Sequence, residues 1–202
     1  MGSDASVKKR ERVKQRVNRF LLGVANTLTL ARLCATPLLV LLLLQTRENP
    51  MFDWFALGLI VVLQLSDVLD GYLARQAQGK LRVNPTGEIL DPIADKLYIN
   101  SAYITLMLIA RVPVWLGLII VTRDVLILSG WVWKYYRSGV KIMPNVWGKA
   151  ADSVQALLLV LILLNPPALA LQSFMWLAAG LTVISGFAYF RVALTPPREA
   201  RP

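Results

Sequence analysis

The feature that most constrains this chain is a series of six long apolar runs separated by short polar connections. With their polar flanks included, the runs lie near residues 27–46, 53–76, 88–110, 113–136, 146–164 and 170–192. A helix that crosses a bilayer needs about 20 mostly apolar residues, which is the approximate length of each run. The chain is 56% hydrophobic and 17% charged, whereas soluble domains are about 25% charged. We therefore predict an all-α integral membrane protein with six transmembrane helices.

The connections are too short to hold a second domain. We predict a basic N-terminal segment over residues 1–25, one membrane domain over residues 26–194 and a short tail over residues 195–202. The first 20 residues are polar and basic, without the short apolar core and small-residue cleavage site of a signal peptide. No cleaved leader is expected.

The net charge of +10 is distributed unevenly along the chain. Basic residues gather before the first run, in the second and fourth connections and in the tail, whereas the odd-numbered connections hold only Arg47 and Arg111. Short cytoplasmic loops of membrane proteins carry the excess of lysine and arginine. We therefore expect both termini in the cytoplasm. Topology accounts for the charge, and we expect no nucleic-acid partner.

The basic N-terminal segment also has helical periodicity. Val13, Val17, Phe20 and Leu21 follow i, i+4, i+7 and i+8 spacing, with basic residues on the remaining face. This pattern predicts an amphipathic interfacial helix that binds anionic membrane lipids. The alternative is a disordered basic tail that only sets the topology.

Four aspartates lie on the flanks of the second and third runs, although a carboxylate inside a bilayer costs roughly 2.5–3.5 kcal/mol. Asp67 and Asp70 are three residues apart, and Asp91 and Asp95 are four apart, so each pair shares one face of a helix. The short connection makes the two helices antiparallel neighbours. The four carboxylates are therefore expected to converge near the cytoplasmic ends of the second and third spans.

Four neighbouring carboxylates cannot all stay ionised without cations between them. The chain has no histidine and a single cysteine, Cys34, in the first run. Oxygen ligands alone favour hard cations, so we predict Mg²⁺ or Mn²⁺. Two ions are expected, because paired metals clamp the phosphoryl oxygens of an in-line displacement.

Small residues lie beside these carboxylates. Gly71, Ala74 and Gly87 leave backbone that a phosphorylated ligand could approach. Arg75 could pair with a phosphate through two parallel hydrogen bonds. The alternative role of the glycine and alanine is close helix packing in lipid.

The spacing of these residues resembles the signature of the CDP-alcohol phosphotransferase family. The matching residues read Asp67-x-x-Asp70-Gly71-x-x-Ala74-Arg75, then Gly87-x-x-x-Asp91-x-x-x-Asp95. Asn26-Thr27-Leu28-Thr29 with Arg32 resembles the family's first-span motif. Three further segments resemble its phosphatidylglycerophosphate synthase and cardiolipin synthase branch: Asp91-Pro92-Ile93-Ala94-Asp95-Lys96, Thr122-Arg123-Asp124, and Gly148-Lys149 to Gln155. One departure is the connection Gln76–Thr86, which is longer than the family's usual eight residues between the arginine and the second glycine.

The resemblance implies transfer of a phosphatidyl group from CDP-diacylglycerol to an acceptor alcohol, with release of CMP. It implies that Asp67, Asp70, Asp91 and Asp95 hold the metal ions and that Asp95 is also the general base. It places the cytidine diphosphate at Asp67, Gly71, Ala74, Arg75 and Gly87. It also implies a homodimer and an active site at the cytoplasmic leaflet.

The acceptor alcohol is open to three interpretations. Arg123, Lys141, Lys149 and Arg191 could form a basic pocket for an acceptor phosphate. Alternatively, Lys141 and Arg191 set topology or snorkel, and Arg123 forms a structural ion pair with Asp124. Glycerol 3-phosphate is the first choice, phosphatidylglycerol the second and an inositol phosphate the third.

A different class of protein also carries carboxylates in membrane helices, namely proton and cation transporters. Transporters place such groups near the bilayer midplane, often at the interface of two internal repeats. Here the carboxylates lie towards helix ends and no repeat is visible. Binding of CDP-diacylglycerol would distinguish the two classes.

Overall fold

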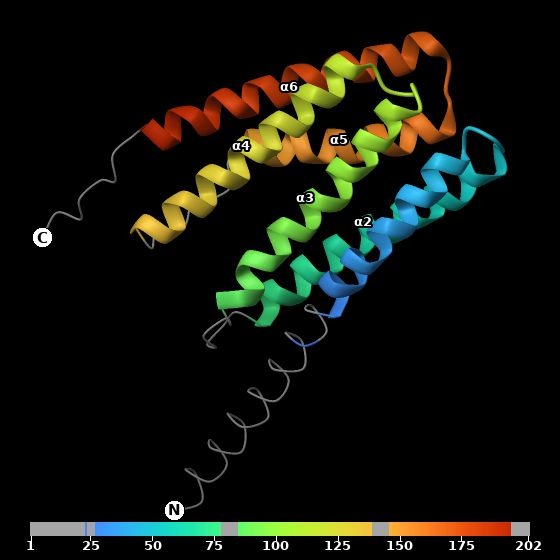
Figure 1. Cartoon of the computed structure of the whole chain (residues 1–202). Helices are drawn as coiled ribbons and strands as arrows, with labels where there is room; N and C mark the ends of the chain where they lie inside the picture. Colours follow the sequence, from blue (N-terminus) through green and yellow to red (C-terminus); the bar gives the residue numbers. More distant parts are fainter. Residues whose placement is uncertain (1–22, 24–26, 78–84, 139–145, 195–202) are drawn as a thin grey trace, which may run out of the picture. The chain divides into compact units, whose positions relative to one another are not determined.

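The computed structural model describes residue 23 and residues 27–77, 85–138 and 146–194 (Figure 1). The regular structure in these ranges is helical, without a strand. Its helices are Thr27–Gln45, α2 (Met51–Ala77), α3 (Pro85–Leu108), α4 (Val114–Ser138), α5 (Val146–Leu164) and α6 (Ala168–Leu194). The prediction of a helix at each apolar run is confirmed. The predicted interfacial helix lies outside the described residues.

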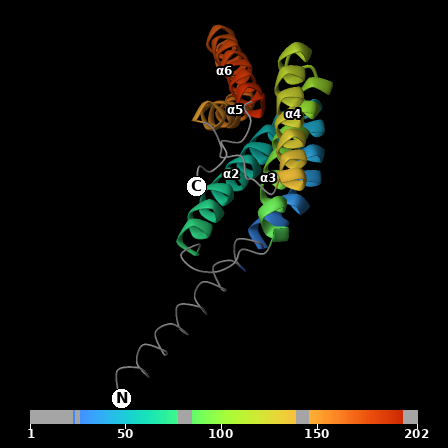
Figure 2. The same cartoon turned by 90° about the vertical axis from the view of Figure 1, so that its left-hand side faces the viewer.

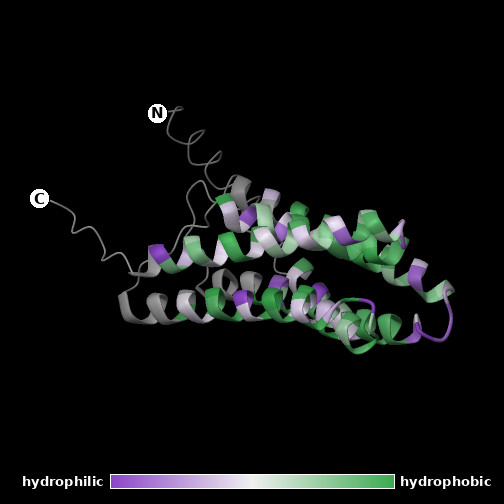
Figure 3. Ribbon diagram, turned by 90° about the horizontal axis from the view of Figure 1, so that it is seen from above, coloured by the Kyte–Doolittle hydropathy of each residue, from purple (hydrophilic) through white to green (hydrophobic). Residues whose placement is uncertain are grey.

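Four of these helices are long and apolar enough to cross a membrane over the part of the chain that is described. They are Thr27–Gln45, Met51–Leu69, Val146–Leu164 and Ala168–Arg191. Hydrophobic colouring dominates the helical ribbon (Figure 3), and many large apolar side chains are exposed, among them Trp54 and Phe187 at 69% and 67%. Soluble monomers rarely expose large apolar patches. The chain is therefore a helical membrane protein, and spans at α3 and α4 stay predictions.

The chain divides into two compact units. The first contains the residues up to Leu39 together with Gly58–Tyr98, and the second contains Val40–Leu57 and the residues from Ile99 onward. All four aspartate positions belong to the first unit. Its buried apolar residues include Ile60 and Leu63 of α2 and Ala94 and Tyr98 of α3.

In the second unit, α6 packs against both α4 and α5 (Figures 1 and 2). Trp115 of α4 and Trp176 of α6 stack with their ring centroids 4.8 Å apart. Leu116 and Ile120 of α4 and Leu158 of α5 are fully buried. These apolar contacts pack together the helices that carry the buried polar residues of this unit.

The end of α3 is a Schellman-type cap. Ala110 has φ 60°, its N–H donates to the Met107 carbonyl, and the Arg111 N–H donates to the Leu106 carbonyl at 2.9 Å. The Arg111 guanidinium then donates to both carboxylate oxygens of Asp53, at 2.5 and 3.0 Å. This bidentate pair ties the α3–α4 connection to the first turn of α2.

Candidate active site

The four predicted carboxylate positions lie on uninterrupted helices. α2 runs through residues 67 and 70, and α3 runs through residues 91 and 95. The predicted sharing of one helix face within each pair is therefore confirmed at the level of the backbone. The same helices carry the remaining positions of the motif. For six of these positions only the backbone is described and the side-chain surroundings are not: Asp70, Gly71, Ala74, Arg75, Gly87 and Asp91.

Asp67 is paired with a buried arginine from the first helix. Nη1 of Arg32 lies 3.1 Å from Oδ1 of Asp67, and the two side chains are 1% and 44% exposed. The Arg32 guanidinium also lies over the Tyr98 ring, 6.0 Å from its centroid. The sequence placed Arg32 in a first-helix motif but did not predict either contact, since the partners come from distant segments.

The described carboxylates fit a hard cation by their chemistry and their exposure. Asp67 and Asp95 are both partly exposed on their helices. Among the residues whose side chains are described, no three histidine, cysteine or acidic side chains lie together, and Asp70 and Asp91 are not among those residues. The donor set consists of carboxylate oxygens, which are the ligands that Mg²⁺ and Mn²⁺ prefer.

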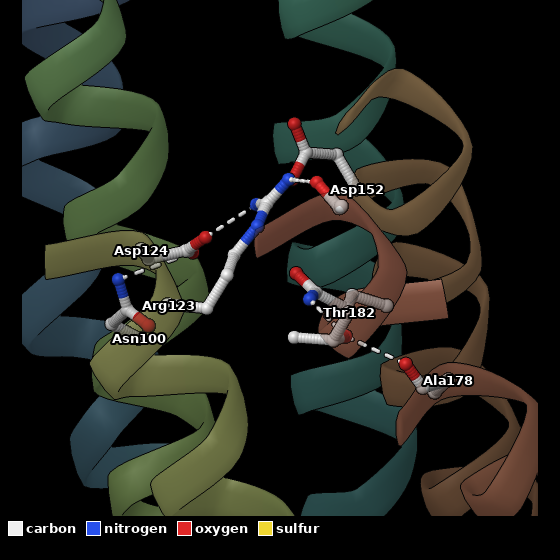
Figure 4. A network of polar contacts seen from close by, with 8 residues as sticks. Asn100, Arg123, Asp124, Asp152, Ala178 and Thr182 are labelled. Carbon is white, nitrogen blue, oxygen red and sulfur yellow. Dashed lines mark hydrogen bonds and ion pairs between the residues drawn. The ribbon is translucent and has the colours of Figure 1, made fainter. Parts of the chain in front are cut away.

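A second polar cluster surrounds Arg123 in the other unit (Figure 4). Nη1 of Arg123 donates to Asp124 at 2.6 Å and to Asp152 of α5 at 2.8 Å. Nη2 donates to Ser185 of α6 at 2.5 Å, and the guanidinium lies 5.9 Å from the Tyr189 ring centroid. The Arg123–Asp124 ion pair is therefore confirmed, whereas sequence reasoning missed Asp152 and Ser185.

A signal for Asp152 was present in the sequence. Asp152 and Gln155 are three residues apart and share one face of α5, and Gly148 lies on that face one turn before Asp152; we call this face the polar stripe of α5. At Gly148, an added Cβ would lie 2.9 Å from Tyr189 Cε2 and 3.4 Å from Arg123 Nη2. A side chain at position 148 would therefore require Tyr189 to shift.

The polar stripe of α5 continues into a buried layer of hydrogen bonds. The Gln155 side chain donates to Thr182 Oγ1 at 2.9 Å, and the Thr182 hydroxyl donates to the Ala178 carbonyl at 2.6 Å (Figure 4). Tyr103 of α3 donates to the Gln155 carbonyl at 2.8 Å. Asn100 donates to Asp124 at 3.4 Å. Within the second unit, α4, α5 and α6 are therefore linked by polar contacts to Asn100 and Tyr103 at the C-terminal part of α3.

An apolar cavity of about 730 Å³ lies between α4 and α6, beside Arg123. Arg123 is 6% exposed and its Nε has no hydrogen-bond partner. Asp124 and Asp152 carry two negative charges, so they already neutralise the single positive charge of the Arg123 guanidinium.

Of the other predicted acceptor-binding residues, Lys149 and Arg191 are exposed on α5 and α6, and Lys141 lies outside the described residues.

The fold and the motif positions describe a helical membrane protein that carries four aspartates on α2 and α3. The family model described as CDP-alcohol phosphatidyltransferase matches residues 22–184. The chain belongs to this family and is an enzyme of the phosphatidyltransferase class. The resemblance seen in the motif is thereby confirmed.

Several relatives match the chain over most of its length. The CDP-diacylglycerol--glycerol-3-phosphate 3-phosphatidyltransferase of Bacillus subtilis is 28% identical over 197 residues, which cover 84% of this chain and 94% of the relative. The protein of the same name from Pseudomonas fluorescens is 29% identical, covering 85% of this chain and 90% of the relative. A cardiolipin synthase (CMP-forming) of Streptomyces coelicolor is 36% identical over 109 residues, but these cover only 54% of this chain and 49% of the relative.

Proposed function

We propose that this protein transfers a phosphatidyl group from CDP-diacylglycerol to glycerol 3-phosphate and releases CMP. One observation carries the choice of acceptor. The relatives that align along almost their whole length bear the name of a glycerol-3-phosphate phosphatidyltransferase. The cardiolipin synthases match with about half of this chain. Similarity along the whole chain includes the helices outside the aspartate motif, where acceptor contacts are expected.

In the proposed reaction, Asp67, Asp70, Asp91 and Asp95 hold divalent cations, with two Mg²⁺ or Mn²⁺ ions expected. When bound, these cations neutralise charge on the pyrophosphate and on the leaving CMP. Arg32 supports this assignment, because its ion pair anchors Asp67 while the Asp67 side chain stays 44% exposed.

Asp95 acts as the general base. It takes the proton from the acceptor hydroxyl, whose oxygen then attacks the phosphorus next to the diacylglycerol. The bond from this phosphorus to the bridging oxygen breaks, and CMP leaves with that oxygen. Gly71, Ala74, Arg75 and Gly87 line the cytidine diphosphate site together with Asp67, and small side chains there let the nucleotide approach the backbone.

For the acceptor phosphate we propose Lys141, Lys149, Arg191 and Arg123. The contribution of Arg123 is weakened by its contacts, because Asp124 and Asp152 already share its Nη1. A phosphate there would have to compete with two carboxylates. The exposed Lys149 and Arg191 are therefore better placed to attract a dianionic acceptor.

We also propose that both termini and the active site face the cytoplasm and that the protein forms a homodimer. The asymmetric distribution of lysine and arginine supports the orientation. A cytoplasmic site suits a lipid donor, a water-soluble acceptor and a soluble nucleotide product. The dimer is implied by the resemblance to the family.

The lipid product tests this function. Purified protein is supplied with CDP-diacylglycerol, Mg²⁺ and equal amounts of glycerol 3-phosphate and phosphatidylglycerol, and the lipids are analysed by mass spectrometry. We expect phosphatidylglycerophosphate. Cardiolipin as the main product would instead favour the second candidate function, that of a cardiolipin synthase. The higher local identity to the Streptomyces coelicolor enzyme supports this second candidate. A transporter would form neither lipid, and the family assignment argues against that class.

A further inference from the structure

Arg32 is a buried cation within an apolar helix. The helix Thr27–Gln45 is long and apolar enough to cross a membrane, yet the Arg32 side chain is 1% exposed. A buried guanidinium is costly unless it is paired and hydrogen-bonded. Charged side chains inside membrane segments generally pair with one another and mark functional sites. The contacts of Arg32 therefore indicate why the charge is there.

Arg32 contacts both of the helices that carry the aspartate motif. Its Nη1 lies 3.1 Å from Oδ1 of Asp67 on α2, and its Cζ lies 6.0 Å from the Tyr98 ring centroid on α3. Tyr98 is 2% exposed and follows Asp95 by one helical turn, so the two residues share a face of α3. All four residues belong to the same compact unit. One guanidinium thus links the positions of the two motif helices.

The ion pair is asymmetric in its exposure. The Arg32 side chain is 1% exposed, whereas the Asp67 side chain is 44% exposed. The carboxylate is therefore anchored from its buried side while a large part of it stays accessible to a ligand. A planar guanidinium fixes the orientation of a carboxylate better than a lysine ammonium does. Its positive charge also reduces repulsion among neighbouring carboxylates.

We infer that Arg32 is a positioning residue for the divalent-cation site, which holds the Asp67 carboxylate in the orientation that a cation requires. This inference rests on the proposed function, because it takes Asp67 to be a cation ligand. Groups that orient metal ligands from outside the coordination shell typically change metal affinity by about 10–100-fold when they are removed. Loss of Arg32 should therefore weaken cation binding more than it weakens binding of the lipid donor.

The experiment measures Mn²⁺ affinity of the purified full chain in detergent by electron paramagnetic resonance of free Mn²⁺. Arg32→Gln should weaken binding about tenfold or more. Arg32→Lys should show a smaller loss, because it retains the charge and loses the planar fork. Arg111→Gln is the matched control, since Arg111 also forms an arginine–aspartate pair, with Asp53 in the other unit. It should leave Mn²⁺ affinity unchanged.

Enzyme kinetics provide a second test besides the Mn²⁺ affinity. In Arg32→Gln, the Mn²⁺ or Mg²⁺ concentration for half-maximal activity should rise about tenfold or more, while the KM for CDP-diacylglycerol changes little at saturating metal. A merely structural role would lower the amount of active protein and leave both constants unchanged.

Wild-type Mn²⁺ affinity in folded Arg32→Gln would overturn the inference. If that variant does not fold, wild-type affinity in Arg32→Lys overturns it instead. Asp67→Asn distinguishes a failure of the proposed cation site from a failure of the positioning role of Arg32. If Asp67→Asn also binds Mn²⁺ normally, the proposed cation site itself is wrong. If Asp67→Asn loses Mn²⁺ and both Arg32 variants do not, only the positioning role fails.

Discussion

In the proposed mechanism, Asp95 alone accepts the proton of the acceptor hydroxyl. Asparagine has a similar size but cannot accept that proton, and it is a weaker cation ligand. We expect Asp95→Asn to lower kcat for CMP release by about 10²–10⁴-fold, the range typical of a general base. Glu48→Gln, at an exposed acidic residue of the first connection, is the control and should retain full activity. Retained activity in folded Asp95→Asn would remove Asp95 from the mechanism.

Substitution of Arg123 measures how much the ion cluster around it contributes to the free energy of unfolding. Arg123→Gln leaves Asp124 and Asp152 without their shared cation, and breaking a buried pair from one side typically costs about 3–5 kcal/mol. We expect a loss of this size in the free energy of unfolding in detergent micelles. The exposed Arg47 is the control, and Arg47→Gln should cost less than about 1 kcal/mol.

A double variant shows whether charge is the cause of this loss. Asp152→Asn removes one of the two carboxylates, so Arg123→Gln combined with Asp152→Asn should be more stable than Arg123→Gln alone. Equal instability of the single and double variants would mean that packing, rather than uncompensated charge, accounts for the effect.

At the residue scale, the sequence predicted contacts between neighbours and missed contacts between distant segments. Arg123 and Asp124 are adjacent, so their pairing could be anticipated. Asp152 is 29 residues away, and only the packing of α5 brings it to Arg123. The ion pair between Arg32 and Asp67 likewise depends on the packing of two helices, which periodicity within one helix does not specify.

Two helices end on non-glycine residues with a left-handed backbone, which allows a paired prediction. Ala110 has φ 60° and Asn165 has φ 47°. This conformation costs alanine roughly 1–2 kcal/mol, whereas asparagine tolerates it. We expect Ala110→Gly to raise the free energy of unfolding by about 0.5–1 kcal/mol after the entropy cost of glycine. Asn165→Gly should change it less.

Thermal unfolding of both variants in the same detergent checks this prediction. A lower unfolding temperature for Ala110→Gly than for the parent protein would contradict it. Arg47→Gly, in a connection that the structure shows as a turn, controls for the general effect of an added glycine on the unfolded chain.

At the element scale, prolines mark helix boundaries. Pro50, Pro113 and Pro166-Pro167 all lie in connections of the structure. The caps themselves were not predictable from glycine, because Ala110 and Asn165 occupy the positions where glycine is usual. α3 and α4 are harder to assign as membrane spans than the other helices, because charged residues interrupt their apolar sequences. Each helix carries charged residues, at the motif in α3 and at Arg123-Asp124 in α4.

For the whole molecule, the charge distribution predicts orientation. An even number of spans places both termini on one side, and the basic connections should be cytoplasmic. Cys34 is the single cysteine of the chain, so Cys34→Ser provides a cysteine-free background. With a membrane-impermeant maleimide on intact cells, Glu48→Cys should be labelled and Ser3→Cys should not. The reverse pattern would invert the proposed topology and place the active site outside the cytoplasm.

Family membership was predictable for the whole molecule because the motif has fixed spacing across two helices. The acceptor was not, since relatives with different names, a glycerol-3-phosphate 3-phosphatidyltransferase and a cardiolipin synthase, both align with this chain. Acceptor recognition depends on side chains from separate helices, and their convergence is a property of the packed chain. Of the residues predicted for it, Arg123 pairs with Asp124, as the sequence allowed, and also with Asp152, which the sequence did not predict.

The most direct measurement is CMP release by the purified protein from CDP-diacylglycerol and Mg²⁺, with glycerol 3-phosphate, phosphatidylglycerol and inositol phosphate each supplied separately. We predict release that requires glycerol 3-phosphate and is lost in Asp95→Asn. Release that requires phosphatidylglycerol or inositol phosphate instead would contradict the proposed acceptor. No release with any acceptor would contradict the proposed transfer reaction itself.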